Sequence, residues 1–274
     1  MREPKLRTVN KATAPFAVNK FPNKMIDILA KNIVYMMATK QSMSLEGSEW
    51  EQIFAECIGA EWKPSNVGLD DVVLDNCCWG AKTVFGQGKL EGQKKVRLIC
   101  GRNAITYSFG VDNYSEVDPN KLGAMVLQIW NERVSAVRQI YKFVRTVVLV
   151  KSKDYSNYLV FEFDTIRYDE ELYYFKWNTR GNLEGYEKST NKHKFTWQPG
   201  GSQFTIIEDI PKNRIHISVQ KPKAIDKNVI LKTLGFDESW YDIISTERVV
   251  ETPTVEMNRR LEIYADTMQE NKSE

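Results

Sequence analysis

The sequence predicts an α/β fold in which a mixed central sheet is flanked by helices. Three observations predict it. Apolar residues recur at helical spacing between residues 22 and 60 and again after Pro119. Short apolar runs separated by Gly, Asn and Lys, which are typical of strands, occupy the region between these helices. The resulting order of two helices, three strands, a helix and another strand is typical of an α/β core.

The same patterns give the expected elements along the chain. Residues 1–21 lack a period and are expected to form an arm. Helices are expected at 22–40, 44–60, 119–137, 226–246 and 255–268, with Ser44 capping the second helix and Gly59 ending it. Strands are expected at 71–75, 79–85, 95–100, 147–150, 158–168, 171–177, 204–208 and 214–219. Residues 178–201 are expected to form a loop, and Pro199-Gly200 a turn between two strands.

Composition predicts one soluble globular unit. The chain has 274 residues, of which 42% are hydrophobic and 11% aromatic, and this argues against disorder. No internal repeat or low-complexity linker divides it. We therefore expect a single compact unit over 1–274, with the helical arm and α/β core in 1–150 and a β-rich part with C-terminal helices in 151–274.

Charge is separated along the chain although the net charge is only +2. Residues 1–24 and 82–102 each carry six basic residues against one acidic residue, and 176–223 carry nine against four. Residues 237–274 carry ten acidic residues against four basic ones. This separation permits a positive face for a polyanion. The alternative is a solvated surface with clusters formed by chance.

The sequence predicts a cytoplasmic protein that does not enter a membrane. No apolar run approaches the roughly 20 residues that span a bilayer, and no signal peptide is visible. The cysteines are therefore expected to be reduced and mostly buried. Adjacent cysteines on a strand point to opposite faces, which disfavours a shared metal site. The four are Cys57, Cys77, Cys78 and Cys100.

Two acids and a lysine in neighbouring expected strands are the residues most suggestive of chemistry. Asp70-Asp71 opens one strand, and Lys82 lies among apolar residues in the next. In an antiparallel pair, Asp71 and Lys82 can lie at the same end of the sheet. A carboxylate can then hold Mg²⁺ against a phosphate oxygen while an ammonium group steadies an attacking water.

This pattern resembles the PD-(D/E)XK nuclease motif, with Asp71 as the metal-binding aspartate and Lys82 as the catalytic lysine. Upstream, residues 47–51 resemble the glycine, aromatic, glutamate pattern of the helix beside the family's catalytic sheet. Downstream, residues 96–103 resemble the strand that completes that sheet. The resemblance covers about residues 44–105 and implies a restriction-endonuclease-like core.

The chain departs from the motif at Gly80, where the family has its second acid two residues before the lysine. Some family members supply this carboxylate from a neighbouring helix, so Glu51 is the first candidate for the catalytic and metal-binding set and Glu56 the second, with Asp75 as a further alternative. Each residue also has a purely structural interpretation: a strand start for the Asp pair, an edge-strand lysine for Lys82, and a solvated helix residue for Glu51.

Candidates for DNA contact follow the third expected strand and fill the 178–203 region. Side chains rich in donors and acceptors can reach base edges or phosphates, although lysines in such a loop are also ordinary solvated charge. The candidates are Arg102, Asn103, Arg180, Asn182, Lys192, His193, Lys194 and Gln203.

The resemblance implies a type II restriction endonuclease that uses Mg²⁺ to cut double-stranded DNA at a short sequence and leaves 5′-phosphate ends. It also implies a homodimer, because two-fold protein symmetry matches a palindromic site. The β-rich part, 151–274, would then contribute DNA recognition. The alternatives are a non-catalytic DNA-binding protein on the same fold and a structure-specific DNA repair nuclease.

Overall fold

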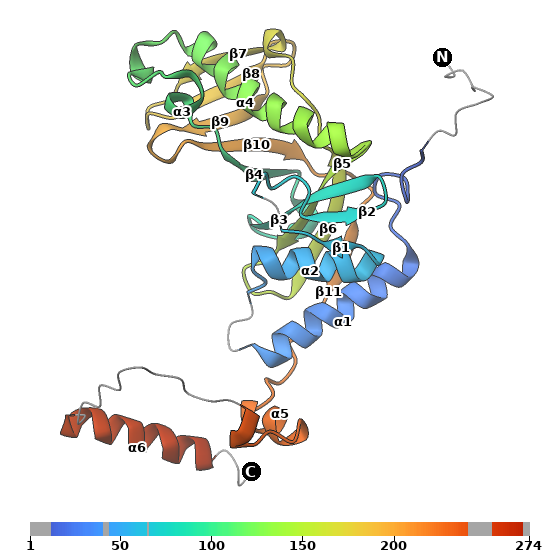
Figure 1. Cartoon of the computed structure of the whole chain (residues 1–274), viewed down its shortest axis with the longest axis vertical. Helices are drawn as coiled ribbons and strands as arrows, with labels where there is room; N and C mark the ends of the chain where they lie inside the picture. Colours follow the sequence, from blue (N-terminus) through green and yellow to red (C-terminus); the bar gives the residue numbers. More distant parts are fainter. Residues whose placement is uncertain (1–11, 41–43, 65, 241–253, 271–274) are drawn as a thin grey trace. The chain divides into compact units, whose positions relative to one another are not determined.

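The computed structural model describes residues 12–40, 44–64, 66–240 and 254–270. Over these residues the chain has six α-helices and two β-sheets, so the predicted α/β class is confirmed at that level (Figure 1). The chain divides into two compact units, Met1–Asp226 and Lys227–Glu274. None of the described helices combines the length and apolar character needed to cross a bilayer.

The first two helices agree closely with the prediction. Helix α1 spans Asn23–Thr39 and buries a four-residue repeat of apolar side chains on one face. Helix α2 spans Gly47–Ile58 and ends at Gly59, which has the left-handed φ of 66° expected of a C-cap. The predicted cap at Ser44 is wrong. Glu46 caps α2 instead, because it forms a reciprocal capping box with Glu49.

The first sheet has six strands in the order β1-β2-β3-β5-β6-β11. Strands β3 and β5 run parallel along their whole length, and every other neighbouring pair is antiparallel. The strands are β1 Glu61–Trp62, β2 Val72–Leu74, β3 Cys77–Phe85, β5 Phe143–Lys151, β6 Asn157–Asp164 and β11 Ile215–Ser218.

The second sheet is antiparallel, in the order β4-β10-β9-β8-β7. Its strands are β4 Lys95–Arg102, β10 Gln203–Asp209, β9 His193–Gln198, β8 Leu183–Glu187 and β7 Tyr173–Trp177. Two predictions are corrected here. The strand expected to complete the sheet of β2 and β3 is β4 of this second sheet, because β2 and β5 occupy both edges of β3. The expected loop at 178–201 contains β8, which buries Leu183 and Gly185, and β9, which buries the consecutive residues Phe195, Thr196 and Trp197.

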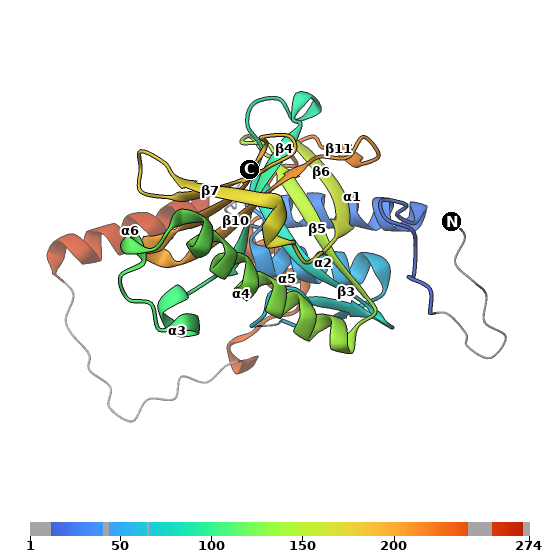
Figure 2. The same cartoon turned by 90° about the horizontal axis from the view of Figure 1, so that it is seen from above.

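Helix α4, Pro119–Ile140, joins the two sheets into one core. Asp118 caps it by accepting hydrogen bonds from the backbone N–H groups of Asn120 and Lys121, and its apolar face packs on both sheets. Figure 2 views α4 with β3 and β5 from above. A short helix that the sequence analysis missed, α3 (Ile105–Phe109), precedes α4.

The two faces of β3 belong to different cores. Trp79 packs with α1 and α2, whereas Cys78 packs with α4 and the second sheet. All four cysteines are buried and free, as predicted, and burial raises the pKa of the Cys57 and Cys77 thiols to about 12. Because side chains alternate along a strand, Lys82 points to the same face as Cys78.

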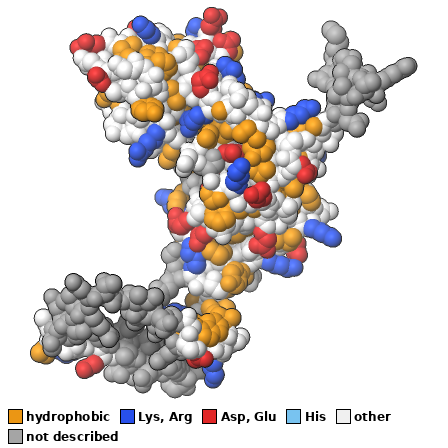
Figure 3. Space-filling view, in the orientation of Figure 1, with side chains coloured by type: hydrophobic (Ala, Val, Ile, Leu, Met, Phe, Trp, Pro, Cys, Tyr) orange, Lys and Arg blue, Asp and Glu red, His pale blue; other side chains and the backbone are white. Residues whose placement is uncertain are grey.

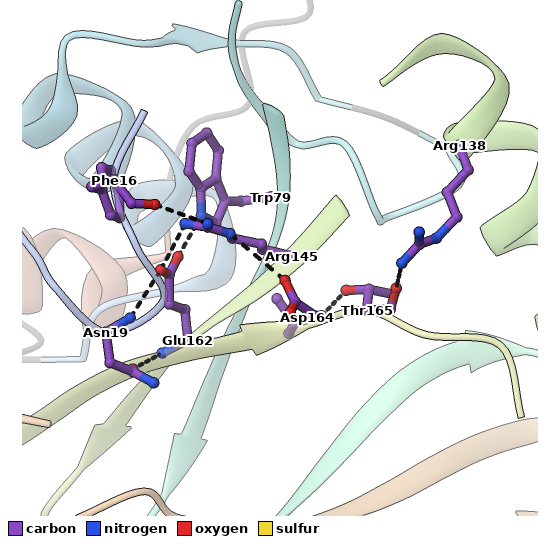
Figure 4. A network of polar contacts seen from close by, with 9 residues as sticks. Phe16, Asn19, Trp79, Arg138, Arg145, Glu162, Asp164 and Thr165 are labelled. Atoms are coloured by element: carbon purple, nitrogen blue, oxygen red, sulfur yellow. Dashed lines mark hydrogen bonds and ion pairs between the residues drawn. The ribbon is translucent and has the colours of Figure 1, made fainter. Parts of the chain in front are cut away.

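A buried polar network holds the N-terminal segment against the first sheet (Figure 4). Glu162 is fully buried and accepts hydrogen bonds from Arg145 at 2.9 Å and from the Trp79 indole at 2.6 Å. Arg145 also donates to the carbonyl oxygen of Phe16, and Glu162 exchanges hydrogen bonds with Asn19. The described part of the predicted arm, residues 12–21, is therefore bound to β5 and β6 of the first sheet. Burial raises the pKa of Glu162, and this effect exceeds the lowering by Arg145.

The second unit contains helix α5, Lys227–Thr233, and helix α6, Val255–Glu270. Helix α6 matches the helix expected at 255–268. Helix α5 is shorter than the helix expected at 226–246, whose last residues, 241–246, lie outside the described ones.

Candidate functional site

The β2–β3 hairpin places the two motif residues at one corner of the first sheet. Val72 pairs with Trp79, so continuing the register by one residue places Asp71 opposite Gly80. The Asp71 side chain is only 4% exposed, and its Oδ2 atom accepts a hydrogen bond from the Ala81 backbone N–H at 3.1 Å. The carboxylate of Asp71 thus contacts β3 one residue before the lysine.

Lys82 makes a second contact between the same two segments, from β3 to the bend before β2. Its Nζ atom donates to the carbonyl oxygen of Gly68 at 3.2 Å, three residues before Asp71. The side chain is half-buried. We call residues 68–71 and 80–82 the motif corner, since the side chains of Asp71 and Lys82 bind each segment to the other.

Asp70 has an unsatisfied oxygen in this corner. Its residue is 8% exposed, and its Oδ1 atom is buried without a hydrogen-bond partner. A buried carboxylate oxygen that lacks a donor is costly, because it has lost its water. A cation is the natural partner for such an atom, and this makes Asp70 a better candidate metal ligand than the sequence pattern indicated.

The surroundings of Gly80 explain why this chain has glycine where the resembled motif has its second acid. A Cβ atom at this position would lie 2.8 Å from the carbonyl oxygen of Gly68 and 3.1 Å from the Cα of Leu69. Both neighbours are backbone atoms, so they cannot move aside as a flexible side chain would. The bend before β2 therefore occupies the space in which the family's second acid would begin.

The structure does not bring the helix acids to the motif corner. Glu51 accepts a hydrogen bond from the indole N–H of Trp62 at 3.1 Å, and Glu56 is exposed. Helix α2 packs on the Trp79 face of the sheet, whereas Lys82 points to the other face. Asp75 is exposed in the turn at the far end of the hairpin. Within the described ranges, no three His, Cys, Asp or Glu side chains are grouped to hold a metal.

Asn103, a predicted DNA contact, lies in the interior. It is 0% exposed, its Nδ2 atom donates to the carbonyl oxygen of Val126 at 2.7 Å, and its Oδ1 atom accepts from Arg133 at 2.6 Å. Its own carbonyl oxygen accepts from the Trp197 indole. These bonds occupy the side chain, so Asn103 positions Arg133 rather than facing a ligand.

The other predicted DNA contacts differ in how available they are. Arg102, Arg180 and Lys192 are exposed, and Asn182 and Gln203 are half-buried. Lys194 forms an ion pair with Glu208 at 2.7 Å. His193 is half-buried with its Nε2 atom 2.7 Å from the carbonyl oxygen of Phe195, and burial lowers its pKa.

Surface charge does not form a single basic face on the view shown. Figure 3 shows Lys, Arg, Asp and Glu side chains interspersed there, without one sign dominating. On this face, the basic clusters counted along the sequence do not merge into one positive patch.

Sequence reasoning missed Arg133, a partly buried arginine of α4. Lys82 and Arg133 both lie close enough to Cys100 to lower its thiol pKa electrostatically, although burial raises that pKa overall to about 11. In the sequence Arg133 lies at the edge of an amphipathic stripe, three residues after Trp130, where basic residues are common. No sequence signal distinguishes it from a solvated arginine.

Comparison of the chain with protein-family models, with curated proteins and with solved structures found no match. A functional proposal for this chain therefore rests on the motif resemblance and on the geometry of the motif corner.

Proposed function

We propose that the chain is a Mg²⁺-dependent nuclease of the PD-(D/E)XK type that hydrolyses phosphodiester bonds of double-stranded DNA. The observation that carries the proposal is the motif corner, where Asp70, Asp71 and Lys82 are held on two hydrogen-bonded segments. Two adjacent carboxylates and an ammonium group that forms no ion pair with a carboxylate in the described part of the chain suit a phosphodiester better than they suit a structural role.

The residues of the corner fit a magnesium ion. Mg²⁺ is commonly held by one or two protein carboxylates together with substrate phosphates and water. Asp70 supplies a buried oxygen that accepts no hydrogen bond from the described residues. When bound, the ion would neutralise charge on the phosphate and lower the pKa of a coordinated water. The pair Asp70 and Asp71 replaces the predicted set of Asp71 with Glu51 or Glu56 in this proposal.

Lys82 and Asp71 are each oriented by a hydrogen bond to the backbone. The backbone N–H of Ala81 fixes one oxygen of the Asp71 carboxylate. The Lys82 ammonium has three protons and donates one to Gly68, which leaves donors for an attacking water and for charge that develops on the phosphate. Cutting at a specific sequence, leaving 5′-phosphate ends and acting as a homodimer are the finer parts of the proposal, and they come from the family resemblance.

A second candidate function is DNA binding without cleavage. It is favoured by Gly80, because the family's second acid is missing from its usual place and α2 does not replace it. In this case the corner would bind a phosphate but would not activate water.

Incubating the protein with phage DNA and Mg²⁺ tests both candidates. Discrete fragments would support a restriction endonuclease, a smear would indicate a nuclease that does not read sequence, and DNA binding without cutting would support the second candidate. We expect Asp71→Ala and Lys82→Ala to lower the cleavage rate by roughly 10²-fold or more, and Asp70→Asn to lower it as well. Asp75→Asn, in the exposed turn, is the matched control and should cut like the wild type. Full cleavage by Asp71→Ala would exclude the proposed site.

A further inference from the structure

Arg133 is held in place by three separate features of the fold. Its Nη2 atom donates to the Oδ1 atom of Asn103 at 2.6 Å. Its guanidinium carbon lies 5.4 Å from the ring centroid of Trp130. Gly101, with φ of 96°, leaves the necessary space, because a Cβ there would lie 2.4 Å from Nη1 of Arg133. The segment 101–103 thus forms a cradle for one guanidinium group.

This arginine has no compensating negative charge among the residues that the structure describes. It forms no ion pair with a described carboxylate, and its Nε atom is buried without a hydrogen-bond partner. Burial lowers its pKa for this reason. A charged group taken out of water without a partner is costly, so a bound anion that pairs with Arg133 would recover part of that cost.

Lys82 is a second such cation on the same side of the sheet. It donates to a backbone carbonyl and has no ion pair with a described carboxylate. Arg133 lies against Gly101 of β4, the residue after Cys100, and the face of β3 that carries Lys82 packs in the same core as Cys100. Both cations also act electrostatically on Cys100. The acid that also acts on Cys100, Glu208, is already paired with Lys194 at 2.7 Å. Both cations are only partly buried, so a ligand can reach them.

We propose that Arg133 and Lys82 together bind one phosphate group of the DNA backbone, the group whose ester bond is cleaved at the motif corner. This inference rests on the proposed function. A phosphate suits the two cations because an arginine fork donates two parallel hydrogen bonds to an oxyanion and the lysine adds a point charge. The anion also removes the repulsion between two like charges in a partly desolvated site.

The test uses inorganic phosphate as the probe and the full chain. Thermal unfolding is followed as phosphate is added, against chloride at equal ionic strength, because a ligand that binds only the folded state raises the melting temperature. We expect phosphate to raise the melting temperature of the wild type. Arg133→Gln should bind phosphate roughly tenfold more weakly or worse, since it loses charge-assisted hydrogen bonds, which are stronger than neutral ones. Lys121→Gln, an exposed basic residue of the same helix, is the control and should respond like the wild type.

The melting temperature without phosphate and the circular dichroism spectrum separate a folding defect from a binding defect. If Arg133→Gln does not fold, Arg133→Lys decides, because lysine keeps the charge but not the fork. Phosphate binding that is roughly threefold weaker or worse in Arg133→Lys supports the proposal. Unchanged phosphate affinity in the folded variant overturns it.

Cleavage of DNA separates this inference from the proposed function. A phosphate response that depends on Arg133, in a protein that does not cut DNA with Mg²⁺, would keep the anion site and remove the nuclease proposal. Cleavage by the wild type that Arg133→Gln equals in rate would keep the nuclease and remove Arg133 from its phosphate site.

Discussion

Replacing Gly80 tests whether the bend before β2 excludes the family's second acid. In open space a Gly→Ala change that the backbone tolerates stabilises a protein by about 0.4–1 kcal/mol, because the unfolded chain loses freedom. At Gly80 the new Cβ would meet the Gly68 carbonyl oxygen at 2.8 Å. Overpacking against atoms that cannot yield costs about 1–3 kcal/mol. The sign of the stability change therefore decides the question.

We expect Gly80→Ala to lower the melting temperature. A change of 1 kcal/mol moves it by about 2–4 °C in a domain of this size, so the clash corresponds to a fall of about 2–12 °C. Gly47→Ala, at the first residue of α2, is the matched control, because nothing lies within 4 Å of a Cβ there. That variant should be as stable as the wild type or slightly more stable.

Gly80→Asp extends the test to activity. The substitution puts an acid at the position of the resembled motif but does not create the space that its side chain needs. Its Cβ meets the same backbone, and the displaced Gly68 is the partner of Lys82. We expect it to be no more stable than Gly80→Ala and to cleave DNA more slowly than the wild type, measured as initial rates with Mg²⁺. A rise in melting temperature for Gly80→Ala, or faster cleavage by Gly80→Asp, would refute the steric explanation.

Three further predictions follow from buried or half-buried polar groups. Glu162→Gln should lower the free energy of unfolding by about 3 kcal/mol, because Arg145 loses its main buried counter-charge. The melting temperature should then fall by about 6–12 °C. A fall of less than about 2 °C would contradict this prediction. Burial lowers the pKa of His193 below its ordinary value of 6.5, so the unfolded chain binds the proton more readily than the folded chain. Stability should therefore decline as pH falls below about 6.5. His193→Gln should reduce this decline in melting temperature, and an unchanged pH profile would count against the prediction. Asn103→Ala should lower the free energy of unfolding by about 1–3 kcal/mol, because its buried hydrogen-bond partners are left unpaired. It should also weaken phosphate binding, because Arg133 loses its orientation. If the variant bound phosphate as tightly as the wild type, Asn103 would not position Arg133.

Local patterns were sufficient for most elements of the fold. The spacing of Leu29 and Ile33 predicts α1, and Pro119 marks the start of α4. The sequence pattern does not predict β8, because Gly185 takes a core position in which alternation would show an apolar side chain. A Cβ at Gly185 would lie 2.5 Å from the Phe175 ring, so packing in the folded sheet, not a turn, explains the glycine.

The candidate site was predicted only in part. Asp71 and Lys82 could be placed near each other because the connection between β2 and β3 is short and fixes their register. The missing acid was sought on α2, since the sequence does not show which face of the sheet a helix covers. The burial of Asp70 and the position of Arg133 depend on contacts with segments far away along the chain.

Local patterns are enough to predict the α/β class, the first helices, the hairpin and the free, buried cysteines, because helix periodicity, turn chemistry and strand alternation act over a few residues. The folded chain adds that β4 belongs to the second sheet, that Gly80 has no room for a side chain, and that Arg133 and Lys82 both act on Cys100. Those features arise where separate segments compete for the same strand edge or the same volume, and no local pattern records the outcome of that competition.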